Sequence, residues 1–257
     1  MDKKEIFEIF ENKDFDKSSF KNSQIIIKEN SVVELNLKPT EEEICVDLEV
    51  EKYASFKLVI LNEKSLKNFK ITANLHSNSE FYIYFADFSL NNLDVETTIN
   101  LVGDYASSKV EFASLVKNED KKKFVVNFEH IGKNTSSDFK GFGVVQNKGN
   151  LVARGDSHIT KPSVKSSASQ LIKVILFDKE SKSTGYPILR IDCDDIKANH
   201  GCAIGTVNPD HIFYLLSRGL NLNEARKLIT AGYLLPIAEN FKENEKNTIE
   251  EIVERSI

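Results

Sequence analysis

The sequence predicts a mainly β protein that ends in a small helical region. From Gln24 to about Ile191 the chain is a series of short strand-like segments, many of which alternate apolar and polar residues. Polar turns separate these segments at a spacing of about a dozen residues, so two segments and their turns give a repeat of roughly 25 residues, within the range of solenoids. Beyond Val207 the apolar period becomes helical. A parallel β-helix fits this rhythm, because stacked rungs bury a continuous core, and a β-sandwich or jelly roll fits the periodicity nearly as well.

The N-terminal segment carries a different pattern, which predicts a short amphipathic helix over 2–11 that docks on the β core. Its apolar stripe consists of Ile6, Phe7, Ile9 and Phe10. We therefore divide the chain into an N-terminal helix and linker at 1–23, a β core at 24–207 and a C-terminal helical subdomain at 208–257.

The densest local signals lie at the junction between the strands and the helices. Apolar residues alternate up to Ile196, and beyond Val207 the period is helical. His200 and Cys202 fall between these two patterns, two residues apart, so they share one face if the backbone there is extended. We interpret this stretch as a turn that leads from the last strand into the first helix.

Capping signals mark the helices that follow. Asn208 as N-cap, Pro209 at the first helical position and Gly219 at the end delimit the first helix. Asn223 as N-cap and Gly232 as stop delimit the second.

A third helix is expected from the capping-box form of Thr248 and Glu251. Pro236 interrupts 234–241, which predicts a broken or short helix there. The polar run Lys242 to Asn247 has the composition of a solvated loop.

Composition excludes several classes of function. The net charge is −5 with both signs interspersed, so no basic field favours nucleic acid or an anionic membrane surface. The N-terminus lacks the apolar region of a signal peptide, and the strongest apolar run, Phe81 to Ala86, is too short to span a bilayer. The three cysteines, Cys45, Cys193 and Cys202, are too few and too irregularly spaced for a disulfide framework. We expect a cytoplasmic protein with free thiols.

Four stretches near the C-terminus carry a resemblance to a known family. They are the runs Asn199 to Gly205 and Phe213 to Gly219, the pair Glu224-Ala225, and Ala231 to Tyr233. Together they join a His-Gly-x-Ala segment to an aromatic-rich helix that ends in Ser-Arg-Gly, and this combination resembles the closing signature of the SufB/SufD family of iron–sulfur cluster assembly proteins. The correspondence extends back to about Phe124. The resemblance implies a right-handed parallel β-helix core with C-terminal helices, which the spacing by itself does not decide.

Two departures from the family pattern indicate the subtype. SufB-like members carry a catalytic cysteine at a position that falls near Ile172 here, and they have an acidic residue after the histidine where this chain has Gly201. Both differences make the chain resemble SufD, a supporting subunit rather than the primary scaffold. The N-terminal region usual in the family is shortened here.

His200 and Cys202 are the candidate residues for a cluster-assembly interface. A lone histidine is more often satisfied by turn backbone, but in SufD-like members the resemblance implies that the histidine at this position faces the partner scaffold. Cys202 could add a soft ligand, and Cys193 lies within reach if the chain doubles back, although buried structural thiols are commoner and the spacing matches no known zinc or iron–sulfur pattern. We therefore expect no metal or cofactor to be held stably, and a cluster at most transiently within a complex.

The family resemblance implies a non-catalytic, SufD-like subunit that pairs with a SufB-like scaffold, or with itself, and docks a SufC-like ATPase. The chain has no GxxxxGK[ST] motif of its own for ATP. We expect Phe213, Tyr214 and Arg218 to form the ATPase-docking surface; the alternative is that the two aromatic side chains complete the core.

The sequence leaves two other functions open. A carbohydrate-active β-helix enzyme would use the acidic cluster Asp192, Asp194 and Asp195, although adjacent carboxylates at a strand end are usually turn formers. A homodimeric SufB-like scaffold is the other, and the missing cysteine near Ile172 argues against it.

Overall fold

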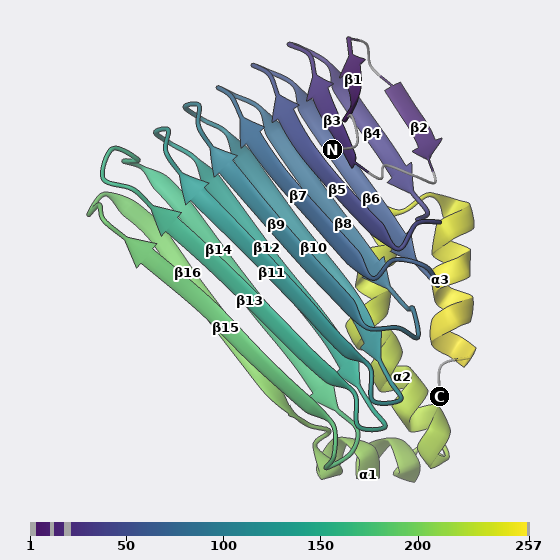
Figure 1. Ribbon diagram of the computed structural model, residues 1–257. Helices are drawn as coiled ribbons and strands as arrows, with labels where there is room; N and C mark the ends of the chain where they lie inside the picture. The colour runs from purple at the N-terminus through teal and green to yellow at the C-terminus, as the bar shows by residue number, and fades with distance from the viewer. Residues whose placement is uncertain (1–3, 11–12, 18–21, 256–257) are drawn as a thin grey trace.

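The structure, a computed structural model, describes residues 4–10, 13–17 and 22–255. Within these residues the chain winds into a parallel β-solenoid with two eight-stranded sheets. The odd-numbered strands form one sheet in the order β1-β3-β5-β7-β9-β11-β13-β15, and the even-numbered strands form the other in the order β16-β14-β12-β10-β8-β6-β4-β2 (Figure 1). Each rung therefore contributes one strand to each sheet. The expectation of a parallel β-helix with helices at its C-terminal end is confirmed, and the sandwich and jelly roll are excluded.

The strands of the odd sheet are β1 (Glu5–Ile9), β3 (Asn22–Ile27), β5 (Glu43–Val50), β7 (Asn68–Leu75), β9 (Leu93–Leu101), β11 (Lys121–His130), β13 (Asn150–Ile159) and β15 (Lys182–Ile191). Those of the even sheet are β2 (Lys13–Lys17), β4 (Val32–Leu37), β6 (Ser55–Asn62), β8 (Glu80–Asp87), β10 (Ser107–Val116), β12 (Ser136–Val145), β14 (Ser166–Leu176) and β16 (Ile196–Thr206). Strand length grows along the chain, from 6 residues in β3 to 11 in β16, so the solenoid widens towards its C-terminal end.

Alternation along each strand sends every second side chain into the space between the sheets. In β5 the buried residues are Ile44, Val46, Leu48 and Val50. Because parallel strands pair in register, residues of like kind stack from rung to rung. Phenylalanine fills the middle of the interior, with the Phe56 and Phe81 rings stacked at 5.5 Å and Phe112 and Phe124 at 4.0 Å between centroids. These contacts give the middle rungs a continuous apolar core.

One row of corners, where an odd strand leads into an even one, holds residues with left-handed backbone. Asn30, Tyr53, Asn78, Tyr105, Asn134 and Lys165 all have φ between 57° and 63°. Each donates its backbone N–H to a carbonyl in the corner of the next rung, as Asn78 does to Asp104 at 2.9 Å. Asparagine adopts this conformation readily, which explains its recurrence here.

A fully buried ion pair closes the opposite row of corners. Lys122 Nζ lies 2.6 Å from Asp87 Oδ2 and also donates to the carbonyl oxygens of Ser89 at 2.7 Å and Leu115 at 3.1 Å. Asp87 accepts further hydrogen bonds from Asn62, Ser89 and Ser114. The pair is thus surrounded by polar partners from several successive rungs.

The C-terminal region consists of α1 (Pro209–Ser217), α2 (Leu222–Leu234), a 3-10 helix η1 (Leu235–Asn240) and α3 (Glu243–Arg255). Helices α2 and α3 and η1 cover the outer face of the even sheet, where they bury a second apolar cluster. Members of this cluster from both sides include Val59, Leu61, Tyr84 and Leu115 of the sheet and Leu234, Ile237, Ile249 and Val253 of the helices. Helix α1 lies beyond the strand ends (Figure 1). No helix within the described residues is long and apolar enough to cross a membrane.

The prediction of an N-terminal helix is wrong. Residues Glu5–Ile9 form β1, which pairs in parallel with β3. Phe7 and Ile9 pack against the core, whereas Ile6 and Phe10 are exposed, so the apolar cluster follows a period of two. Pairing with β3 satisfies the backbone groups that an isolated short helix would leave to water. Residues 1–3 and 11–12 lie outside the described part of the chain.

The first helix is confirmed in its capping, but the limits predicted for the next two are wrong. The Asn208 side chain accepts from the Asp210 backbone N–H, Pro209 opens α1, and Gly219 after it has φ +94°. In α2 the N-cap is Asn221, because a capping box with Glu224 outcompetes the predicted start at Asn223.

Gly232 lies inside α2, because packing on the sheet carries the helix beyond it to Leu234. Helix α3 begins at Glu243, so most of the predicted loop at 242–247 is helical, and Thr248 donates to the Asn244 carbonyl in mid-helix instead of capping. Burial of Glu245 and Ile249 against neighbouring elements extends this helix towards the N-terminus. The break at Pro236 is confirmed as η1.

Candidate functional site

Among the described residues, the last rung has one uncovered side, as does the first rung of β1 and β2 at the other end of the solenoid. β15 and β16 end their sheets, so each leaves one edge without a neighbouring strand among the described residues. Its side chains are correspondingly open, with Tyr186 50% and Ile191 42% exposed. Unpaired N–H and C=O groups along two parallel edges form a ready template for pairing with another chain.

His200 and Cys202 both lie on this rung, within β16 rather than in a turn. β16 pairs with β14 so that His200 is opposite Gln170 and Cys202 is opposite Ile172. Paired residues of parallel strands point to the same side, and Gln170 and Ile172 are buried in the interior. His200 and Cys202 therefore point to the inner side of the solenoid, at its open end.

The thiol of Cys202 lies across the interior from Gly185 on β15. A side-chain carbon added to Gly185 would come within 2.5 Å of Cys202 Sγ, so only glycine leaves room for the sulfur. Burial raises the pKa of the Cys202 thiol, which keeps it protonated at neutral pH. The sulfur becomes a ligand only if a metal displaces that proton.

Cys193 does not join this pair. It precedes β16, and Cys202 lies six residues beyond the start of that strand at Ile196, or about 20 Å along it. Within the described part of the chain, no group of three or more His, Cys, Asp and Glu side chains is arranged to hold a metal ion.

The acidic cluster predicted for a carbohydrate-active enzyme is divided among different contacts. Asp192 Oδ2 lies 2.9 Å from His158 Nε2, while the Asp195 carbonyl accepts from the Lys165 backbone N–H. Asp194 is exposed. With Asp192 paired to a histidine, the three residues do not form a pair of facing carboxylates.

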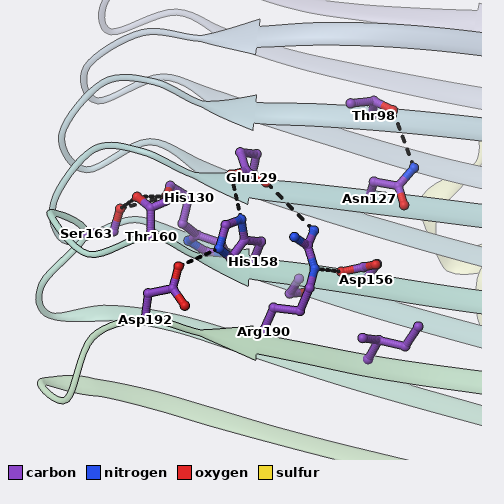
Figure 2. Close-up of polar contacts among 12 residues, drawn as sticks. Thr98, Asn127, Glu129, His130, Asp156, His158, Thr160, Ser163, Arg190 and Asp192 are labelled. Atoms are coloured by element: carbon purple, nitrogen blue, oxygen red, sulfur yellow. Dashed lines mark hydrogen bonds and ion pairs between the residues drawn. The ribbon is translucent and has the colours of Figure 1, made fainter.

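Beside Asp192, a charged ladder runs across the outer face of the odd sheet. Glu129, His158 and Arg190 occupy paired positions on β11, β13 and β15 (Figure 2). His158 Nδ1 lies 2.7 Å from Glu129 Oε1, so both ring nitrogens face carboxylate oxygens, which only accept hydrogen bonds. The Asp192 and Glu129 carboxylates raise the pKa of His158, and the imidazolium form satisfies both contacts.

Two arginines hold one buried carboxylate within the same surface. Asp156 accepts from Arg190 Nε and from Arg154 Nη2, both at 2.8 Å. Sequence reasoning missed this ladder. The signal that would have found it is the repeat, since Glu129, His158 and Arg190 recur at equivalent positions of successive rungs.

The other histidines have local roles. His130 is buried between the hydroxyls of Thr135 and Ser137, each 2.8 Å away, and burial lowers its pKa to about 4. His76 lies 3.2 Å from Glu49 at the surface. His211 is exposed on α1.

The proposed docking residues are exposed on α1. This helix has no buried residue, and Phe213 and Tyr214 are 73% and 55% exposed. Arg218 lies over the Tyr214 ring at 5.1 Å from its centroid. The alternative that these two aromatic side chains complete the core is therefore excluded for the isolated chain.

The apolar surface continues from α1 onto α2. Leu216, Leu222 and Leu228 are also exposed. A groove of about 600 Å³ between α2 and α3 is lined by Leu220, Lys227, Leu228, Ala231, Leu235 and Val253, among others. Exposed aromatic and leucine side chains on neighbouring helices are typical of a protein interface.

A family model described as the SufBD core domain of the SUF system for iron–sulfur cluster assembly matches residues 9–233. The iron–sulfur cluster assembly protein SufD of Bacillus subtilis is 28% identical over 163 residues, which are 63% of this chain and 37% of that relative.

Two further relatives match shorter stretches. SufD of Escherichia coli is 28% identical over 100 residues, 39% of this chain and 24% of the relative. A SufBD family protein of Mycobacterium leprae is 32% identical over 112 residues, 44% of this chain and 13% of the relative. The chain thus matches well under half the length of each of these curated relatives.

Proposed function

Because this chain belongs to the SufBD family of the SUF system for iron–sulfur cluster assembly, we propose that it acts in cluster assembly as a non-catalytic, SufD-like subunit. In this role it pairs with a SufB-like scaffold and docks a SufC-like ATPase. The observation that carries the proposal is the open last rung, which presents an inward-facing histidine between two unpaired strand edges.

Pairing through the last rung follows from the chemistry of strand edges. A partner strand beside β15 or β16 would satisfy the free backbone groups and cover Tyr186 and Ile191. His200 and Cys202 would then lie at the junction of the two subunits, shielded from water. There an imidazole can bind iron or transfer a proton, and the thiol offers a soft ligand.

Docking of the ATPase is assigned to α1 and the adjoining part of α2. Phe213 and Tyr214 supply large apolar area and Arg218 a cation, which is the composition of interface anchors. Since the sequence has no P-loop, the nucleotide would be bound by the partner. Helix α1 follows directly on β16, so movement of the ATPase would act first on the strand that carries His200.

We further propose that the isolated chain holds no stable cluster and that a cluster forms only when a partner supplies more ligands. His200 and Cys202 are two soft donors, whereas iron–sulfur clusters commonly need four. Anaerobic reconstitution of the chain alone with iron and sulfide should leave it colourless after desalting. A stoichiometric visible chromophore on the chain alone would contradict this.

Co-expression with the SufB-like and SufC-like proteins of the same organism tests the assignment. We expect a complex on size-exclusion chromatography with light scattering, which also distinguishes a heterodimer from a homodimer. If the chain binds neither protein, the proposal fails.

Within that complex, His200→Ala should lower the rate of cluster formation at least about tenfold, the scale seen when a metal-site partner is lost. His76→Ala, at a surface contact just after β7, is the matched control and should leave the rate unchanged. Equal rates for wild type and the His200 variant would remove His200 from the function.

A further inference from the structure

Most of the exposed apolar side chains of the solenoid gather along one row of corners, where odd strands lead into even ones. Between residues 22 and 191, eight large apolar side chains are exposed, and six of them lie in these corners or at the strand ends beside them: Val32, Tyr53, Val102, Tyr105, Ile131 and Ile191. The row forms the edge of the solenoid remote from α1, α2 and α3 (Figure 1). It is therefore a surface separate from the helical one.

Two tyrosines in this row have an unusual backbone. The left-handed position of five successive corners is occupied in turn by Asn30, Tyr53, Asn78, Tyr105 and Asn134. Tyr53 and Tyr105 have φ of 60° and 63°, and their exposed fractions are 58% and 59%. Asparagine adopts this conformation readily, whereas a bulky side chain does so rarely. A strained backbone that presents an aromatic ring to solvent points to a surface with a function.

Backbone hydrogen bonds hold these five corners in a regular stack. The Tyr53 N–H donates to the Ser77 carbonyl at 3.1 Å, and the Tyr105 N–H donates to the Lys133 carbonyl at 2.9 Å. Successive rungs lie about 4.8 Å apart, so the two tyrosines are about 10 Å apart with Asn78 midway between them. We call these five residues, together with the residue before each of them, the corner ridge, which is about 19 Å long.

The order of residues along the corner ridge is the same from either end. Asparagine and tyrosine alternate symmetrically about Asn78. A contact between two copies of one chain is commonly isologous, which means that the same patch meets itself about a twofold axis. If that axis crosses the ridge at Asn78, the two ridges run antiparallel. Tyr53 of one copy then faces Tyr105 of the other, and each asparagine faces an asparagine.

The charges on the corner ridge fit the same arrangement. The residues that precede the five left-handed positions are Glu29, Lys52, Ser77, Asp104 and Lys133, and the four charged ones are exposed. In the antiparallel arrangement Lys52 faces Asp104 of the second copy, and Glu29 faces Lys133. Ser77, which is neutral, lies at the axis and faces its own copy. A parallel arrangement would instead place every charge against a like charge, so the charge pattern favours antiparallel docking.

We propose that the corner ridge is the contact surface for a second copy of this chain, docked antiparallel about a twofold axis at Asn78. The tyrosine rings supply the apolar contact, and the two Asn78 amides can each donate to and accept from the other. Because the ridge is short, the contact is smaller than a standard protein interface, and we expect a weak, reversible dimer. The proposal goes beyond the proposed function and does not rest on it, since a chain that binds no SUF partner could still form this dimer.

Sedimentation equilibrium of the full chain over a wide range of protein concentrations tests the proposal. The double variant Tyr53→Asn, Tyr105→Asn gives both corners the residue that the fold uses at the neighbouring corners. Its far-ultraviolet circular dichroism and melting temperature should not fall, and its dimerisation should weaken at least about tenfold. A wild-type chain that stays monomeric at every concentration would overturn the proposal.

Tyr186→Asn is the matched control, because Tyr186 is also half-exposed but lies on β15 in the last rung. This variant should dimerise as the wild type does. If Tyr186→Asn weakens the dimer and the double variant does not, the two copies pair through the last rung, and the proposal is overturned.

A charge exchange tests the antiparallel register and keeps both tyrosines, so it stands even if the tyrosine variant fails to fold. Lys133→Glu places a like charge opposite Glu29 of the second copy and should weaken the dimer at low ionic strength. Adding Glu29→Lys to the same chain should restore it, because the two residues then attract again with their charges reversed. A dimer that is unaffected by Lys133→Glu, or one that Glu29→Lys does not restore, would overturn the proposed arrangement.

Discussion

The middle rungs and the last rung are built from the same strand pattern and differ in what covers them. In the middle, each rung has a neighbour on both sides, and Phe69, Phe112 and Phe124 are almost completely buried. In the last rung, inward positions are occupied by Gly185, His200 and Cys202 and face an open end. In a solenoid each rung contacts only its neighbours, so stability is concentrated in the middle and the final rung is free to carry polar chemistry.

The largest effect is expected from the buried ion pair of the middle rungs. Lys122→Ala leaves Asp87 charged and buried without its cation, which costs about 3–5 kcal/mol of unfolding free energy. Urea unfolding followed by circular dichroism measures it. Lys121→Ala, at the exposed neighbouring position, is the control and should change stability by less than about 0.5 kcal/mol. Equal losses of unfolding free energy in the two variants would show that the buried ion pair stabilises the fold no more than an exposed lysine does.

A smaller effect, visible only in acid, is expected from buried His130. Burial lowers the pKa of His130 to about 4, whereas an unfolded chain has a histidine pKa near 6.5. Stability from this neutral histidine is therefore full above about pH 6.5 and is lost as pH falls towards 4, by about 3 kcal/mol. The measurement compares unfolding free energies of wild type and His130→Gln from pH 7 to 4. Parallel profiles would show that His130 does not titrate with unfolding.

His158, beside the last rung, should respond in the opposite direction. The Asp192 and Glu129 carboxylates raise its pKa in the fold, so the stabilisation is full below about pH 6.5 and is lost as pH rises through the raised value. Because the site is near the surface, the loss should be only about 1 kcal/mol. His158→Gln should therefore be less stable than the wild type by about 1 kcal/mol at pH 6 and about equally stable at pH 9, where the wild type has lost this contribution. A variant that loses stability equally at pH 6 and pH 9 would contradict this assignment.

The smallest effect on stability is expected on α1. Arg218→Glu loses only an exposed contact with the Tyr214 ring, which is worth about 0.5–1 kcal/mol. The same variant should abolish binding of the ATPase in a pull-down while far-ultraviolet circular dichroism stays unchanged. Ser217→Ala, also exposed on this helix, is the control. Retained binding by folded Arg218→Glu would place the docking surface elsewhere.

The strands could be predicted from the sequence because alternation is a local property, but their arrangement could not. Which strands pair depends on contacts between residues 18 to 32 positions apart, from Glu5 and Ser23 at one end to His158 and Arg190 at the other. β1 was mistaken for a helix because a short apolar cluster fits both periods, and pairing with β3 decided the outcome. The N-cap of α2 was misplaced by two residues because several asparagines compete and only Asn221 meets Glu224.

The candidate site could be predicted in part. The motif located His200 and Cys202, and the register was needed to place them on the inner side of β16. The ladder of Glu129, His158 and Arg190 was missed because the rungs differ in length, so equivalent positions do not recur at one fixed interval.

The widening of the solenoid sets a direction for local unfolding. The pairing of β3 with β5 spans 6 residue pairs, and the pairing of β14 with β16 spans 11. The number of residue pairs that hold neighbouring rungs together therefore nearly doubles along the solenoid. Amide hydrogen exchange should therefore spread from the narrow end, where few bonds must open together, while the long final pair holds. The open last rung is therefore anchored by one of the longest ladders, and a partner strand would add to a rigid template.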